Sequence, residues 1–108
     1  MQVNDLEERI DNVSHEFSGV VREVIDTSSL ITSLEEERNA QIDYLKTIPE
    51  SSSAYKKKSK ELKDTTAKLV DANSRLHAAT SKERQHQAKL DDLQKQLMEK
   101  KQQLARKS

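Results

Sequence analysis

Glu83 and His86 are the two residues of this chain whose types and spacing come closest to those of a metal site. A Glu and a His three residues apart lie on one face of a helix, and such pairs hold di-metal centres in four-helix proteins. A complete site also needs a second pair and two further carboxylates, and no inward-facing Glu lies clearly opposite this one. A polar layer that sets the register of a coiled coil accounts for the pair better. The sequence therefore predicts no metal and no cofactor.

Lysines form the second chemically suggestive cluster. Residues 56–60 read Lys-Lys-Lys-Ser-Lys, and Lys63 and Lys68 follow. Such a run can bind the phosphates of nucleic acid or of anionic lipids. It has no interleaved aromatic residue on which a base could stack, and the chain has no Gly-rich phosphate loop. A solvated basic face beside an acidic helix is the preferred interpretation, and binding of nucleic acid or a membrane surface stays open as the alternative.

No other constellation in the sequence indicates catalysis. The chain has no Cys, which excludes a thiolate nucleophile, a disulfide and a Cys-based zinc site. It also has no nucleophile triad, nucleotide-binding loop or dinucleotide fingerprint. We therefore predict no catalytic residues, no small-molecule substrate and no enzymatic activity.

The composition favours long helices over a compact globule. Hydrophobic residues make up 32% of the chain and charged residues 35%, against about 45–50% and 25% in typical globular domains. One Gly, one Pro and no Trp leave little material for tight turns or a thick core. No apolar run approaches the roughly 18 residues of a membrane span, and the N-terminal residues lack the features of a secretory signal. We expect an intracellular protein of the cytoplasm or nucleus that is neither secreted nor transmembrane.

Residues 1–48 predict an acidic amphipathic helix. Apolar residues recur there in alternating steps of three and four, which is the a/d rhythm of a coiled coil. We call the resulting stripe the seam. Arg38 and Gln41 occupy two seam positions where apolar residues are missing. Its apolar members in this part of the chain are Val3, Leu6, Ile10, Val13, Phe17, Val20, Val24, Ile31, Leu34, Leu45 and Ile48.

Residues 54–108 predict a basic helix with leucine heptads. Leu62, Leu69 and Leu76 repeat every seven residues, and the series resumes at Leu90 after a break at Glu83. His86 occupies the other seam position of the interrupted heptad. The final LARKS continues the heptad, which leaves open that the sequence is part of a longer chain.

Residues 49–53, Pro-Glu-Ser-Ser-Ser, predict the turn between the helices. Proline lacks the N–H of the helical ladder and disfavours helical geometry in the residue before it. A connection this short makes the helices antiparallel neighbours, although a kinked continuous rod remains as an alternative. Residues 1–50 hold 12 acids and 4 bases, while residues 51–108 hold 7 acids and 15 bases. A hairpin that places residue i opposite about residue 103 − i therefore sets an acidic helix against a basic one.

The chain has more apolar residues beside the seam than one partner helix can cover. Val21, Ile25 and Leu30 flank the seam, and Leu104 lies beyond the start of the first helix. Clustered aliphatic residues of this kind are typical of a docking surface for further helices. The predicted partner-binding residues are Val20, Val21, Val24, Ile25, Leu30, Ile31, Leu97 and Leu104, and the predicted polar seam residues are Arg38, Gln41, Glu83 and His86.

These patterns together predict an all-α chain of two long helices in an antiparallel coiled-coil hairpin, assembled into a dimer or a multi-helix bundle. Its predicted function is that of a structural and interaction module, which mediates oligomerisation and spacing within a larger assembly. The predicted partners are further copies of the chain or other coiled-coil proteins.

Overall fold

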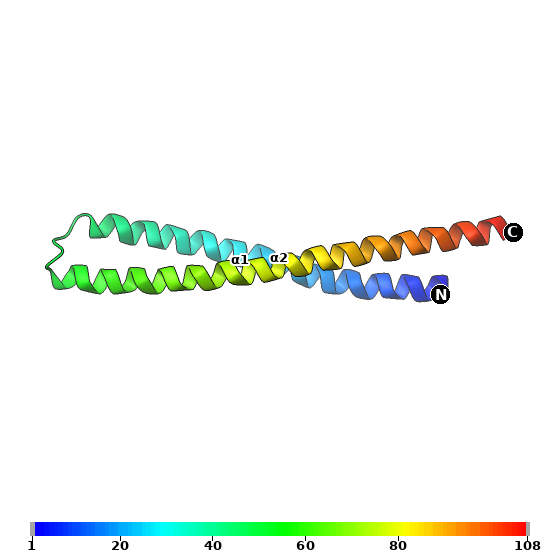
Figure 1. The fold of residues 1–108 in the computed structure, drawn as a ribbon, viewed down its shortest axis with the longest axis horizontal. Coiled ribbons are helices and arrows are strands. Elements are labelled where there is room, and N and C mark those ends of the chain that lie inside the picture. The colour runs from blue at the N-terminus through cyan, green and yellow to red at the C-terminus, as the bar shows by residue number, and fades with distance from the viewer. Residues whose placement is uncertain (1, 108) are drawn as a thin grey trace. The chain divides into compact units, whose positions relative to one another are not determined.

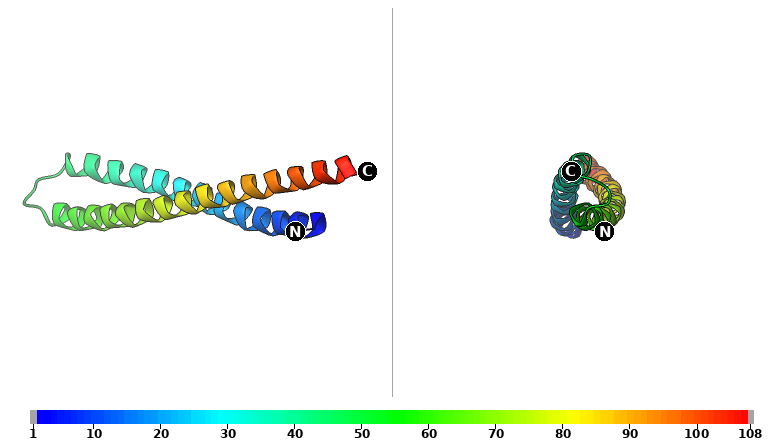
Figure 2. Two further views of the ribbon diagram at one scale, coloured as in Figure 1. Left: turned by 45° about the vertical axis from the view of Figure 1, so that its right-hand side comes forward. Right: turned by 90° about the vertical axis from the view of Figure 1, so that its left-hand side faces the viewer.

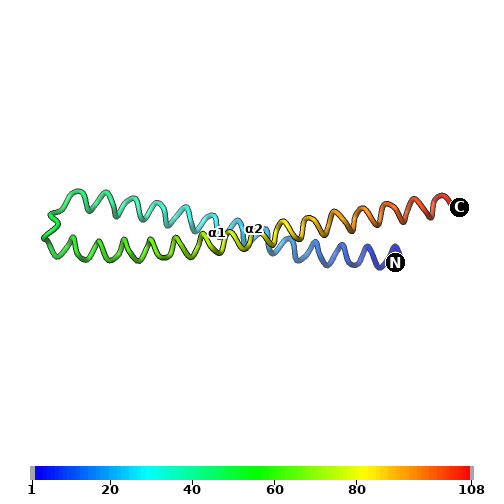
Figure 3. Tube along the Cα trace, in the orientation of Figure 1, coloured from blue at the N-terminus to red at the C-terminus, as the bar shows by residue number. Residues whose placement is uncertain are grey.

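A computed structural model describes residues 2–107 of the chain. Within them the fold is all-α: α1 spans Val3–Leu45, α2 spans Ser53–Lys107, and no strand is present (Figure 1). The Cα trace coils regularly on both sides of the turn (Figure 3). None of the helices described here has a stretch long and apolar enough to cross a membrane.

Burial in both helices follows the three-and-four rhythm of the sequence. Each seam position from Leu6 to Leu45 in α1 is buried or half-buried, and so is each one from Tyr55 to Lys100 in α2. Most of the residues between these positions are exposed. Each helix therefore buries one narrow stripe, and this is why so polar a chain still forms long helices: the stripe supplies the packing that propensity alone does not.

The turn occupies residues 46–52, so α1 ends three residues before the predicted boundary at 48. Pro49 explains the early end, because it has no N–H to donate to the helix and it disfavours helical geometry at Ile48. The Thr47 backbone N–H and hydroxyl both donate to the Tyr44 carbonyl, at 3.0 Å and 2.6 Å. Ser52 begins α2 as its cap, since the Ser52 hydroxyl oxygen accepts the backbone N–H of Tyr55 at 3.1 Å.

The chain divides into two compact units, each of which pairs a segment of α1 with a segment of α2. The first, here called the terminal unit, contains the described residues 2–23 and 79–107. Its core is one cluster in which both helices contribute buried residues. The members of that cluster are Leu6, Val13, Leu90 and Leu93, with Ile10, Phe17 and Leu97 packed against them.

The second unit, here called the turn unit, is Val24–Ala78. It is a helical hairpin. The parts of α1 and α2 next to the turn lie side by side in Figure 1 and in the left view of Figure 2. Its core cluster joins Ile31 and Leu34 of α1 to Leu69 and Ala72 of α2, with Leu76 packed against them. The predictions of an all-α fold, two helices and a hairpin are confirmed.

Truncating a buried seam leucine should destabilise the fold far more than the same change outside the seam. Leu93 is 4% exposed in the core of the terminal unit, whereas Leu104 is 50% exposed. We expect Leu93→Ala to lower the free energy of unfolding by about 2–5 kcal/mol. Leu104→Ala, the matched control, should change it by no more than about 0.5 kcal/mol. Urea unfolding followed by circular dichroism measures both, and equal effects would mean that the seam does not stabilise the helices.

Candidate functional site

The predicted partner-binding residues of the turn unit do not share one surface. Ile31 is buried in the core and Val24 is half-buried, while Ile25 is 59% exposed and Leu30 is 41% exposed. Ile25 and Leu30 are five residues apart, which places them about 140° from each other around α1. Leu30 lines a shallow groove together with Lys68 and Arg75 of α2. Ile25 therefore lies on the other side of the hairpin.

The predicted partner-binding residues of the terminal unit also differ in exposure. Val20 and Val21 are half-buried, and Leu97 packs against the core cluster of this unit. Leu97 also lines a shallow groove with Met98 and Ala105 near the end of α2. Leu104, at 50% exposure, presents much of its side chain to solvent.

Three exposed apolar residues, two on α2 and one on α1, were not predicted from the sequence. Val70 is 64% exposed and Met98 is 62% exposed, and Tyr44 of α1 is 44% exposed. None of the three lies on the seam that the heptad pattern singles out. A helical projection of α2 outside its seam positions would have revealed Val70 and Met98.

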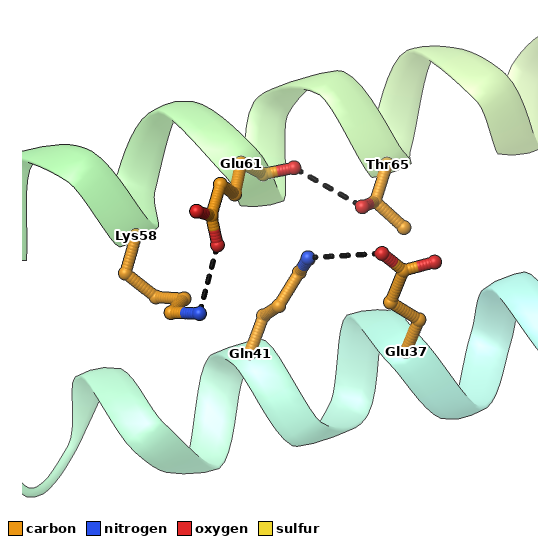
Figure 4. A network of polar contacts seen from close by, with 5 residues as sticks. All are labelled: Glu37, Gln41, Lys58, Glu61 and Thr65. Atoms are coloured by element: carbon orange, nitrogen blue, oxygen red, sulfur yellow. Dashed lines mark hydrogen bonds and ion pairs between the residues drawn. The ribbon is translucent and has the colours of Figure 1, made fainter.

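Gln41 is the most buried of the predicted polar seam residues, at 8% exposure. Its amide nitrogen donates to the Glu37 carboxylate at 3.5 Å along the same helix. The amide oxygen is buried and has no hydrogen-bond partner. Across the hairpin, the buried Thr65 hydroxyl donates to the Glu61 carbonyl at 3.1 Å (Figure 4). Arg38 is half-buried. The turn unit thus contains a polar section of the seam whose hydrogen bonds run within each helix.

Lys58 occupies a seam position beside this section and points toward Glu61 (Figure 4). The Lys58 ammonium lies 2.7 Å from the Glu61 carboxylate and 5.1 Å from the centroid of the Tyr44 ring. The hydrogen bond to Glu61 raises the pKa of Lys58 above 10.5, and the same bond lowers the pKa of Glu61 below 4.5. One lysine of the predicted basic run is therefore already engaged by acidic and aromatic neighbours.

The first turns of α2 carry four further exposed lysines: Lys56, Lys57, Lys60 and Lys63. Lys68, farther along α2, is also exposed. An exposed set of cations on one stretch of helix can attract phosphate groups. Binding of nucleic acid or an anionic membrane by these lysines is therefore a second candidate role for the turn unit.

Glu83 and His86 are both half-buried in the seam of the terminal unit. Nε2 of His86 lies 3.4 Å from the Glu16 carboxylate of α1, which is 62% exposed. Nδ1 of His86 lies 2.8 Å from the Lys82 carbonyl oxygen. The contact of His86 with α1 is the kind expected of a polar seam layer. Among residues 2–107, no three His, Asp or Glu side chains are grouped as metal ligands would be.

Replacing both Glu83 and His86 by Leu should stabilise the terminal unit. The change continues the apolar seam between the buried residues Ala79 and Leu90. It removes two half-buried polar groups and one contact to an exposed carboxylate, which contributes little. We expect the free energy of unfolding to rise by about 1–3 kcal/mol, measured by thermal unfolding.

The matched control for this prediction makes the same two replacements on the exposed side of α1, at Glu8 and His15. That variant should change stability by no more than about 0.5 kcal/mol. If the seam variant proves less stable than the unchanged protein, Glu83 and His86 make specific contacts that outweigh the apolar gain.

No protein-family model matches the chain, and comparisons with curated proteins and with solved structures find no similar chain.

Proposed function

We propose that this chain is a non-enzymatic antiparallel coiled coil that oligomerises and holds partners at a spacing within a larger assembly. The observation that carries the proposal is the burial pattern. Seam positions are buried or half-buried without a gap from Leu6 to Leu45 and from Tyr55 to Lys100. Alternation of three and four over so many turns is the spacing that knobs-into-holes packing requires, and it supports the proposal.

The composition of the two core clusters supports antiparallel pairing. Ile31, Leu34, Leu69 and Ala72 form one cluster, and its members can be matched across the helices so that the numbers of each pair, Ile31 with Ala72 and Leu34 with Leu69, add to 103. Leu6 belongs to the cluster of the terminal unit and Leu97 packs against that cluster, and their numbers add to the same value. A constant sum is what two helices running in opposite directions produce.

The charge distribution supports the same pairing and a role in association. The acidic first half and the basic second half attract each other across the seam, and equally across a contact between copies. Exposed aliphatic residues remain on both helices, among them Ile25 and Val70. Aliphatic side chains left outside a two-helix seam are what a further docking helix would cover.

Electrostatic binding of nucleic acid or an anionic membrane is the alternative proposal, and the exposed lysines at the start of α2 favour it. The two roles differ in their response to salt. Contacts to phosphate weaken steeply as salt concentration rises, whereas an apolar seam is little affected.

Sedimentation equilibrium at about 0.1 M and about 1 M salt separates these roles. We expect a molar mass of at least twice the 12.4 kDa of one chain at both salt concentrations. The control variant Lys56→Glu with Lys57→Glu should keep that mass, because both lysines are exposed and lie outside the seam. A single-chain mass at every concentration would contradict self-association. If the single chain also bound duplex DNA or anionic vesicles at low salt only, and the control variant did not, the alternative would hold.

A further inference from the structure

Ile25 and Val70 lie on the same side of the turn unit. Ile25 precedes the groove residue Leu30 by five positions, and Val70 precedes the groove residue Arg75 by five. Five residues turn a helix by about 140°, so both side chains lie across the seam from that groove. They are 59% and 64% exposed, the two most exposed large aliphatic side chains in this unit.

Apart from Arg22, the exposed residues one turn from Ile25 and Val70 are uncharged, in contrast to Lys68, Asp71 and Arg75 on the groove side. The hydroxyl of Thr32 donates to the Ser28 carbonyl at 3.2 Å, and that of Thr66 to the Leu62 carbonyl at 2.9 Å. Because these hydroxyls already have acceptors within their own helices, burying them leaves no unpaired donor. We define the uncharged face as Ile25, Ser28 and Thr32 of α1 with Thr66, Val70 and Asn73 of α2.

Charges border the uncharged face toward the turn, and their sign differs between the helices. Glu36 and Asp43 are exposed on α1, whereas Lys60 and Lys63 are exposed on α2. A partner must therefore present basic groups to α1 and acidic groups to α2. A second copy does so when a two-fold axis parallel to the helices lays each α1 on the other copy's α2. A two-fold axis across the helices would lay acidic α1 on acidic α1, which like-charge repulsion opposes.

We propose that a second copy of this chain docks on the uncharged face, with α1 of each copy packed against α2 of the other. This inference rests on the proposed function and names its partner, surface and orientation. In the resulting four-helix arrangement Ile25 and Val70 of both copies are buried, which removes exposed aliphatic area from water. Every neighbouring pair of helices also runs antiparallel, so the helix dipoles attract one another.

Ile25→Glu combined with Val70→Glu should dissociate the dimer. Placing two carboxylates per copy in the contact should raise the dimer dissociation constant on the order of 100-fold or more. The matched control, Ser33→Glu with Ala78→Glu, adds the same charges to the same helices at exposed positions turned away from the face. It should leave the dissociation constant within about threefold of its original value. Sedimentation equilibrium measures the constants, and circular dichroism checks that all variants stay helical.

Cross-linking tests the orientation, and the absence of Cys from the sequence makes single-Cys variants specific. Ser29 and Ser74 are exposed residues beside the face, and their numbers add to 103, so they lie at the same level of the hairpin. A mixture of Ser29→Cys and Ser74→Cys chains should give mixed cross-linked dimers with a short bis-maleimide. Preferential cross-linking of Ser29→Cys chains to one another would overturn the proposed orientation.

The outcomes also separate this inference from the proposed function. An oligomer that survives Ile25→Glu with Val70→Glu, while remaining helical, would overturn the docking surface and leave coiled-coil association in place. A wild-type chain that is monomeric throughout would overturn both self-association and the docking surface.

Discussion

Burial of one narrow apolar stripe along each helix is the interaction on which the rest of this structure depends. Aromatic residues make up 3% of the chain, so the stripe is thin. The most buried large side chains, such as Leu6 and Leu93, belong to it. Because conformational entropy opposes ordering each residue of both helices, the contacts along the seam must offset that cost almost alone. Polar or small residues in the seam therefore reduce the stability of the fold.

The buried polar residues of the seam differ in how much their burial costs. Thr27 and Thr65 are each 3% exposed, and Gln41 is 8% exposed. The Thr65 hydroxyl is satisfied within its own helix, so its burial costs little more than the lost apolar contact. The Gln41 amide oxygen lacks a donor, and its burial lowers stability. Such a residue is tolerated where it makes other registers of the two helices less stable, which is the established use of polar groups in coiled-coil seams.

The seam positions could be predicted from the sequence because burial in a two-helix pairing follows spacing almost without exception. The sequence predicted the end of α1 less accurately than it predicted the seam. Pro49 acts on the residues before it, and the Thr47 hydroxyl adds a hydrogen bond to the Tyr44 carbonyl of the last turn. Grouping Ile25 with Leu30 as one surface overlooked the angle of about 140° between them. Val70 was missed because the heptad pattern draws attention to the seam, while Val70 lies outside it.

The two units, each with its own core cluster, make the hairpin testable in two places. Within each unit, the paired segments of α1 and α2 belong to one and the same chain. Spin labels at the exposed pairs Glu8 with Lys95 and Glu36 with Ala67 report on the terminal and turn units respectively.

Pulsed electron resonance on such doubly labelled chains, diluted in an excess of unlabelled protein, tests this claim most directly. With interaxial distances of about 8–10 Å, and with labels on the outer sides of both helices, each pair should give a narrow distribution at roughly 20–30 Å. Loss of that distance on dilution would show that the helices pair between chains, and would contradict the account.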